Sequence, residues 1–497
     1  MQVDVVETAP RDVEADVLGF AVPEPTELPA AVQQLDELVN GRLTHLVEDG
    51  ELTGSRGAVT LVHTIGELAA HRLAAAGVGP AAELDADAVR AAAASVAAKT
   101  GLTGGRTVAW LLADDGLPLA EEARAAVEGI LLGRYDAGRW KTNGMPPTPV
   151  ERIVLCGRGA KAVAEEAREA AVVAGWANRC RDIVNAPPNE LTPVRLAGFA
   201  EEVAGGSRAL TVETLGPGEI EAAGMGAFAA VAQGSENEPR LIRLAYEPER
   251  PVRADVVLGL VGKALTFDAG GLSLKPADGM DEMKSDMGGG AAVLAAVGAI
   301  AELGLPVRIL AVVPACENMP GGHAYRPGDI LTAANGKTIE VTNTDAEGRL
   351  ILADALWYAR EEGATHLLDL ATLTGTIVVA MGDFYAGLFG SDPDWVGEVQ
   401  AAADASGDHA WTMPLHRSYR RFLDSEFADV KNCPDKKRGS SIIAALFLQE
   451  FAGEGPWAHL DIAGTAYIDR ARDPFPRMGA TGYGVRLLAA LARRLSA

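Results

Sequence analysis

The chain has 497 residues, of which 48% are hydrophobic, 5% aromatic and 23% charged, and its formal net charge is −24 at pH 7. This length predicts two domains with large apolar cores, packed mostly by Ala, Val and Leu because aromatic residues are few. The strong negative charge opposes binding to a polyanion by counterion release, so a nucleic-acid partner is not expected.

The start of the chain is acidic and lacks the charged-then-apolar order of a signal peptide. No apolar run reaches 18 residues without a charge, so no membrane span is expected. The cysteines are scattered without the spacing of metal ligands, which is typical of a reducing compartment. They are Cys156, Cys180, Cys316 and Cys433. We therefore expect a cytoplasmic protein.

Residues 1–170 predict a smaller α/β domain without a catalytic motif. Its histidines, His45, His63 and His71, are too isolated to suggest a metal site. Apolar runs predict strands at 57–66, 107–114 and 152–157, and Ala-rich patterns predict helices at 67–76, 87–99 and 119–132.

A helical pattern covers residues 160–185 and is followed by two consecutive prolines, Pro187 and Pro188. Proline cannot continue a helix, so this stretch predicts a domain boundary. We assign 171–187 to a connecting helix and linker, and 188–497 to a larger catalytic domain.

The larger domain alternates buried strands with helices. Strands are predicted at 254–262, 307–314, 338–342 and 366–371, and helices at 288–303, 347–362 and 439–451. This alternation predicts a mostly parallel central sheet flanked by helices, and active sites of such sheets lie at the carboxyl ends of the strands.

Polar residues gather after these strands, between positions 261 and 350. Four carboxylates lie there beside three cations: Asp268, Asp286, Asp345 and Glu347 with Lys263, Lys275 and Arg349. Taken singly, each fits a turn or a solvated surface pair. Lys263 and Asp268 follow one strand, however, and Asp345 follows another at the start of a helix. Carboxylates brought together at one edge of a sheet repel one another unless cations neutralise them, and hard oxygen ligands suit Mg²⁺, Mn²⁺ or Zn²⁺.

At this point the sequence resembles a known family. VGKALTFDAGG (261–271) and NTDAEGRL (343–350) are similar to blocks of the leucine aminopeptidase (cytosol aminopeptidase) family of two-metal exopeptidases. The resemblance continues through DLATLTG (369–375), WAHLDIAGTA (457–466) and GATGYGVRLL (479–488). It covers roughly residues 175–490 well and the first 150 or so poorly.

The resemblance implies two divalent ions per chain, Mn²⁺ or Zn²⁺, with Asp268 and Glu347 bridging them. Asp345 would complete one metal site, and Lys263 and Asp286 the other. It further implies that Lys275 stays protonated and donates to the scissile carbonyl oxygen. Arg349 would hold a bicarbonate ion that relays the proton. The substrate pocket would include Met283, Thr372, Leu373 and Gly375, with Gly375 allowing a tight backbone path. His459 and Asp461 would support the site without ligating metal, and His366 would be structural.

The implied activity is removal of N-terminal residues, with Leu and other apolar residues preferred, from peptides with a free amino terminus. The resemblance also implies a homohexamer in which the N-terminal domain serves architecture and assembly. Two alternatives stay open: a narrow dipeptidase of the cysteinylglycine type, and a DNA-binding regulatory member of the family, which the charge disfavours. Ala269, His323 and the SSII segment at 440–443 depart from the family pattern, and they put substrate preference in question rather than the reaction.

Overall fold

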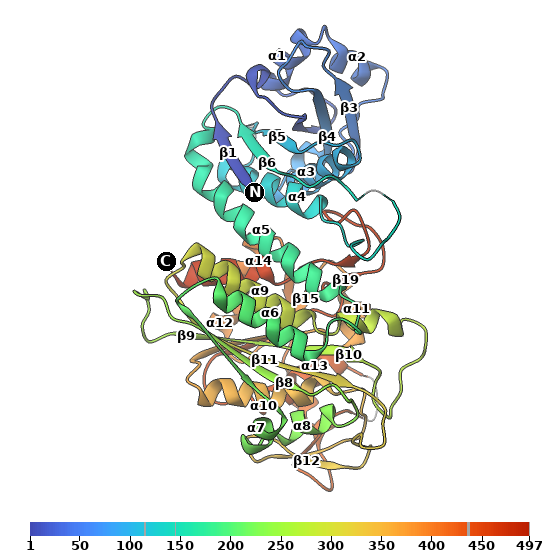
Figure 1. Ribbon diagram of the computed structural model, residues 1–497, viewed down its shortest axis with the longest axis vertical. Coiled ribbons are helices and arrows are strands. Elements are labelled where there is room, and N and C mark those ends of the chain that lie inside the picture. The colour runs from blue at the N-terminus through green and yellow to red at the C-terminus, as the bar shows by residue number, and fades with distance from the viewer. Residues whose placement is uncertain (114–115, 145, 435–437, 497) are drawn as a thin grey trace. The chain divides into compact units, whose positions relative to one another are not determined.

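The computed structural model of the chain describes residues 1–113, 116–144, 146–434 and 438–496 (Figure 1). The chain divides into two compact units: Met1–Asn178 with Asp469–Met478, and Arg179–Ile468 with Gly479–Ala497. The division falls within helix α5 (Ala164–Asn185). Ten residues close to the C-terminus therefore belong to the first unit.

The first unit is built on a six-stranded sheet in the order β1-β6-β5-β2-β4-β3. Neighbouring strands are parallel except β3 and β4, which are antiparallel. The strands are β1 (Gln2–Val6), β2 (Val17–Glu24), β3 (Val59–His63), β4 (Arg72–Pro80), β5 (Thr107–Leu111) and β6 (Arg152–Cys156). The helices are α1 (Ala30–Leu38), α2 (Arg42–Glu48), α3 (Ala86–Gly101) and α4 (Leu119–Gly133).

Alternate strand residues of this unit enter two separate cores, because successive side chains of a strand point to opposite faces. Val17 and Trp110 pack with α3 and α4, whereas Leu18 and Leu111 pack with α1 and α2. Gly129 lets α4 approach α3 closely, since a Cβ there would lie 2.2 Å from the Arg90 carbonyl oxygen. The smaller domain is thus a sheet covered by helices on both faces.

The predicted helix at 67–76 is wrong, because strand β4 runs from Arg72 to Pro80. Its Ala-rich sequence favours a helix locally. In the fold, β4 pairs with β2 on one side and β3 on the other, and its small side chains are buried between the two helical layers. Tertiary pairing overrides the local preference.

The second unit contains a nine-stranded sheet in the order β16-β15-β18-β14-β9-β11-β8-β7, with β10 added beside β11. The central strands β18, β14, β9 and β11 are mutually parallel, and β10 is parallel to β11. Antiparallel pairing occurs at β11–β8, β8–β7 and β15–β18. The expected mostly parallel sheet is confirmed. Its strands are β7 (Leu210–Leu215), β8 (Arg240–Tyr246), β9 (Val257–Gly262), β10 (Ala264–Asp268), β11 (Arg308–Asn318), β14 (His366–Ala371), β15 (Ala386–Gly390), β16 (Ala410–Thr412) and β18 (Trp457–Asp461).

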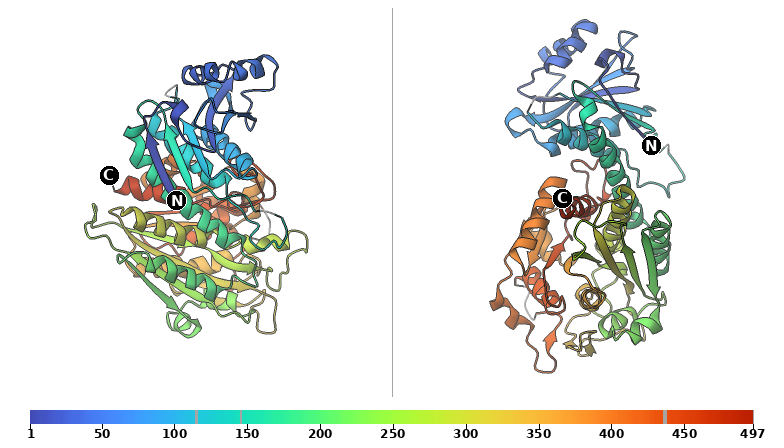
Figure 2. Two further views of the ribbon diagram at one scale, coloured as in Figure 1. Left: turned by 45° about the horizontal axis from the view of Figure 1, so that its top comes forward. Right: turned by 90° about the vertical axis from the view of Figure 1, so that its left-hand side faces the viewer.

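Helices cover both faces of this sheet (Figures 1 and 2). Helices α8, α10 and α13 share one core with strand residues such as Val261 and Leu367. Helix α9 contacts β9, β11 and β14 and packs with α6 and α14 on the other face. The helices are α6 (Pro193–Gly205), α7 (Pro217–Ala222), α8 (Gly226–Ala232), α9 (Gly288–Leu303), α10 (Gly348–Glu361), α11 (Gly375–Met381), α12 (Pro393–Ser406), α13 (Ser440–Gln449) and α14 (Val485–Leu495).

The predicted strand at 338–342 exists only as β13 (Thr338–Glu340), and it lies outside the main sheet. It pairs with β12 (Ile330–Thr332) and β17 (Val430–Lys431) in a small three-stranded sheet. The expectation that Asp345 follows a strand of the parallel sheet is therefore wrong. Such a short apolar run carries no information about which sheet it joins.

One stretch of the described chain, Met280–Leu303, is long and apolar enough to span a membrane by composition. Its most apolar window is 83% buried inside the protein, as expected for a core helix.

Candidate active site

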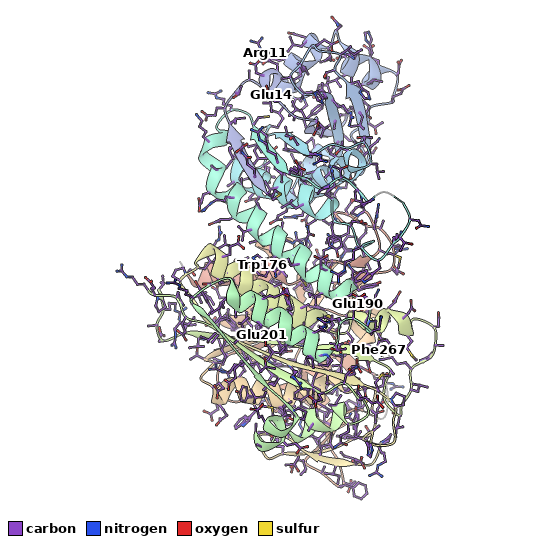
Figure 3. All side chains as sticks on the ribbon, in the orientation of Figure 1. Arg11, Glu14, Trp176, Glu190, Glu201 and Phe267 are labelled. Carbon is purple, nitrogen blue, oxygen red and sulfur yellow. The ribbon has the colours of Figure 1, made fainter. Side chains whose placement is uncertain are left out.

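The carboxyl ends of three parallel strands, β9, β14 and β18, meet at one edge of the main sheet. Lys263 directly follows β9, Thr372 follows β14, and Asp461 ends β18. Strand β10 continues beyond Lys263 along the far half of β11. The register of β10 shifts between Leu265 and Phe267, and this bulge brings Asp268 opposite Asn318. Figure 3 labels Phe267.

Three glycines at the start of α9 allow that helix to approach these strand ends closely. A Cβ on Gly289 would lie 2.0 Å from the Leu370 carbonyl oxygen, and one on Gly290 would lie 2.8 Å from the Ala264 Cβ. The Gly290 N–H donates to the Lys263 carbonyl oxygen at 2.7 Å. Asp286, just before the helix, is thereby held beside Lys263.

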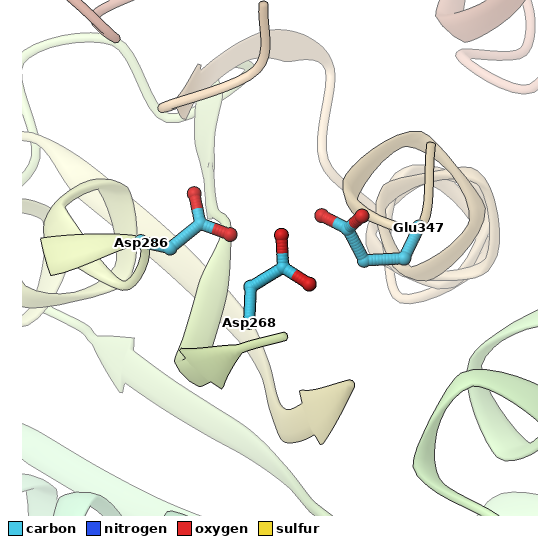
Figure 4. Close-up of side chains that lie close together, drawn as sticks. All are labelled: Asp268, Asp286 and Glu347. Carbon is cyan, nitrogen blue, oxygen red and sulfur yellow. The ribbon is translucent and has the colours of Figure 1, made fainter. Parts of the chain in front are cut away.

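Asp268, Asp286 and Glu347 form a compact buried cluster with ligand atoms all within 4.8 Å of one another (Figure 4). They come from the end of β10, the approach to α9 and the start of α10. The Lys263 ammonium lies between two of them, 2.9 Å from Asp286 Oδ2 and 3.0 Å from Glu347 Oε1.

Lys275 joins Asp345 to this cluster. Its Nζ lies 2.7 Å from Asp268 Oδ2 and 2.5 Å from Asp345 Oδ1. The Asp345 side chain is 34% exposed, whereas that of Asp268 is 2% exposed, so Asp345 forms the open side of the group.

The cluster has more negative than positive charge in a buried environment. Burial, together with the charges of Glu347 and Asp286, raises the pKa of Asp268 to about 8. Burial also raises the pKa of Asp286 to about 6, although the Lys263 ammonium opposes it. Four carboxylates face two ammonium groups here. The excess negative charge and the hard oxygen donors fit divalent cations.

The pKa values of the two lysines are raised as well, which favours the charged form of a lysine but the neutral form of a carboxyl group. Burial favours the neutral amine of Lys263, but Asp286 and Glu347 outweigh it and raise its pKa above the ordinary value. For Lys275, burial likewise lowers the pKa, and the surrounding carboxylates, Asp268 first, raise it further than burial lowers it. Lys275 is therefore an ammonium at neutral pH.

Gly348 is required by the position of Lys263. A Cβ at residue 348 would lie 2.6 Å from Lys263 Cε and 2.7 Å from its Nζ. The glycine in the NTDAEGRL block thus provides the space through which the lysine reaches the cluster.

Asn318 is a site residue that the sequence analysis missed. Its fully buried amide donates to Asp268 Oδ1 at 2.8 Å and to the Thr344 carbonyl oxygen at 3.0 Å. It therefore orients one carboxylate and fixes the segment that carries Asp345 and Glu347. The available signal was the polar pair Glu317 and Asn318 at the end of a long apolar run. It was missed because the predicted strand ended at 314, whereas β11 continues to Asn318.

The predicted pocket residues differ in how directly they contact the carboxylate cluster. Thr372 donates its hydroxyl to Asp286 Oδ1 at 2.6 Å, and its carbonyl oxygen accepts from Lys263 Nζ at 2.9 Å. Leu373 is half-buried against the α10 core. Met283 is half-buried, and its carbonyl oxygen accepts from the Asp286 N–H at 3.3 Å.

Gly375 begins α11 and is exposed. Its φ is not positive, and a Cβ there would meet no atom within 4 Å. The backbone conformation at Gly375 therefore does not by itself require glycine, and its predicted role in the close approach of a substrate stays a prediction.

Arg349 is buried at the second position of α10. Its Nη1 donates to the Asn432 carbonyl oxygen at 2.7 Å, and its buried Nε has no hydrogen-bond partner. Within the described residues it makes no ion pair with a carboxylate. A buried N–H without an acceptor beside a helix N-terminus fits a small anion.

The histidines lie outside the carboxylate cluster. His366 packs edge-on against Trp395 with ring centroids 5.1 Å apart. His459 Nδ1 lies 2.6 Å from Asp369 Oδ1, and both side chains are fully buried.

Comparison with known proteins agrees with this geometry. Residues 178–489 match the model of the cytosol aminopeptidase family, catalytic domain, and residues 17–144 match that of its N-terminal domain. The chain is 49% identical to the probable cytosol aminopeptidase of Solibacter usitatus over 370 residues, which are 74% of this chain and 76% of the relative. It is 41% identical to the probable cytosol aminopeptidase of Azotobacter vinelandii over 495 residues, 98% of each chain.

Solved structures give the same result. A variant of tomato leucine aminopeptidase is similar with a TM-score of 0.89 and 35% identity, over 99% of this chain and 96% of the other. The bottromycin maturation enzyme BotP in complex with Mn is similar with a TM-score of 0.85 and 35% identity, over 97% of this chain and 100% of the other. The two family models together match both domains, and the resemblance noted in the sequence is confirmed. The chain is a peptidase that belongs to the cytosol aminopeptidase family.

Proposed function

We propose that this peptidase is a two-metal aminopeptidase that removes N-terminal Leu and other apolar residues from peptides during cytoplasmic peptide turnover. The buried cluster of Asp268, Asp286 and Glu347, with Lys263 and Lys275 against it, carries this proposal. Relatives named cytosol aminopeptidases and a similar structure in complex with Mn support it.

Asp268 and Glu347 are proposed to bridge two divalent ions, Mn²⁺ or Zn²⁺. Asp345 completes one site, and Lys263 with Asp286 completes the other. When bound, such ions supply Lewis-acid charge and lower the pKa of an attacking water. Their charge also opposes protonation of Lys263, so the amine that is cationic beside carboxylates alone becomes a neutral ligand.

Lys275 has a different proposed role. Its side chain is 21% exposed, and its ammonium contacts Asp345 on the open side of the cluster. A peptide carbonyl placed there would receive a hydrogen bond that strengthens as negative charge develops on its oxygen. The carboxylates of the cluster also favour a substrate with a free amino terminus over one with an acylated terminus, as an exopeptidase requires.

The test is hydrolysis of leucine anilide, N-acetyl-leucine anilide and cysteinylglycine by the metal-loaded protein. We expect the protein to cleave leucine anilide, whose amine is free, and not N-acetyl-leucine anilide. A chelator should abolish this activity, and Mn²⁺, Zn²⁺ or Co²⁺ should restore it. Cleavage of cysteinylglycine alone would favour the narrow dipeptidase. A DNA shift at low salt without peptidase activity would favour the regulatory alternative.

Arg349 is proposed to hold a bicarbonate ion, which would supply the base that the metal-bound carboxylates cannot. The unpartnered, buried Nε supports this assignment. In carefully degassed buffer, added bicarbonate should raise wild-type turnover, and Arg349→Ala should be slow and unresponsive in the same assay. Equal stimulation of both proteins would remove Arg349 from this role.

Assembly into a homohexamer is proposed on the family resemblance alone. A closed, symmetric six-chain particle is the expected form. Light scattering coupled to size exclusion at micromolar concentration should give six times the 51.7 kDa chain mass. A monomer mass under those conditions would contradict the proposal.

A further inference from the structure

We propose that Asp461, acting through the hydroxyl of Thr374, is a positioning residue that holds the 372–374 turn against the metal-binding cluster. This inference rests on the proposed function, because the turn matters only if the cluster holds metal. Asp461 itself lies outside the compact carboxylate cluster.

Nearly all hydrogen bonds to the Asp461 carboxylate come from this one turn. Its Oδ1 accepts from the backbone N–H groups of Leu373 at 3.2 Å and Thr374 at 3.3 Å, with a weaker contact from Ala463 N at 3.4 Å. Its Oδ2 accepts from the Thr374 hydroxyl at 2.6 Å. A fully buried carboxylate is costly unless such donors satisfy it, so turn and carboxylate fix each other.

The other end of the turn contacts two proposed metal ligands. Thr372 donates its hydroxyl to Asp286 and accepts from Lys263 Nζ through its carbonyl oxygen. A neutral lysine amine has two N–H donors and one lone pair. Holding one N–H on the Thr372 carbonyl directs the lone pair, so displacing the turn would misdirect Lys263 and release Asp286.

A row of hydroxyls extends this anchor to α13. Thr374 Oγ1 lies 2.7 Å from Ser441 Oγ, which lies 2.8 Å from Thr376 Oγ1. Because the single Thr374 hydroxyl hydrogen points to Asp461, Ser441 donates to Thr374 and Thr376 donates to Ser441. The bond from Thr374 to Asp461 thus sets the direction of the other two bonds in the row, and the row ties the turn to α13 and α11.

The network is tested with Thr374→Val, Thr374→Ser and Asp461→Asn. Valine keeps the shape of Thr374 and removes the hydroxyl, whereas serine keeps the hydroxyl. Asp354→Asn is the matched control, since Asp354 is equally buried and accepts backbone N–H groups, from Phe228 at 2.8 Å and Ala334 at 2.7 Å, away from the turn. Each protein is examined by Mn²⁺ titration calorimetry of the metal-free form, by kcat and KM, and by thermal melting.

Thr374→Val and Asp461→Asn should each lose about 10- to 100-fold in Mn²⁺ affinity or kcat, the range found when groups orienting metal ligands are removed. KM should change less than kcat. Thr374→Ser should stay close to wild type, and Asp354→Asn should lower the melting temperature without changing Mn²⁺ affinity or kcat.

The inference is overturned if Thr374→Val binds Mn²⁺ and turns over as wild type does, or if Thr374→Ser is as impaired as Thr374→Val. Should Asp461→Asn fail to fold, the Thr374 pair decides alone. Absence of aminopeptidase activity in the wild-type protein would refute the proposed function, while the Mn²⁺ affinities would still test the positioning.

Discussion

Glu347→Ala and Asp268→Ala should each bind no metal and show no peptidase activity above background. Each carboxylate is proposed to bridge both ions, so its loss removes a ligand from two sites at once. Metal content after dialysis, measured by mass spectrometry of the folded protein, should fall from two ions per chain to none. Chelation should lower the melting temperature of the wild type and leave these variants unchanged, because only a protein that binds the ions is stabilised by them.

Folding of the metal-free Asp268→Ala protein should be preserved. Burial, with the charges of Glu347 and Asp286, raises the pKa of Asp268 to about 8. Ionised Asp268 therefore destabilises the folded protein when no metal ion is bound. Asp281→Ala is the matched control, an exposed aspartate five residues before Asp286 that should keep both ions. If either bridging variant retains two ions, the bridging assignment is wrong.

Lys275→Ala should lower kcat by about a hundredfold or more, with metal content intact. Loss of one preorganised donor to a developing oxyanion costs about 2.7–4 kcal/mol in comparable cases. Lys263→Ala should instead lose metal at one site, because Lys263 is itself a proposed ligand, whereas Lys275 contacts Asp268 and Asp345 as an ammonium on the open side of the cluster. Single-turnover kinetics and metal content on the same preparations separate the two effects.

Lys284→Ala serves as the matched control, since this lysine lies on the same approach to Asp286 and its Nζ donates to the backbone oxygen of Asn185 at 3.5 Å rather than to the carboxylate cluster. It should keep both metal content and kcat. Equal depletion of metal in the Lys263 and Lys275 variants would abolish the distinction between ligand and oxyanion donor.

The sequence alone determined the fold class and the cluster members, because both depend on local signals. Long buried strands alternating with helices require a mostly parallel sheet, and residues that follow such strands must emerge at one edge. Lys263, placed directly after a strand, was predictable on that basis. The family resemblance added the roles proposed for Asp286 and Glu347, which lie just before helices α9 and α10.

Tertiary structure alone decided the features that depend on partners distant in sequence. The Ala-rich run at β4 became a strand because two neighbours pair with it, and the short run at β13 joined a separate sheet. Asn318 reaches Asp268 only because a bulge in β10 sets the register of that pairing. The Asp461 network likewise joins β18, the turn after β14 and α13, whose contacts no local pattern specifies. Propensity and periodicity report what a segment can be, whereas pairing and side-chain packing select its partner.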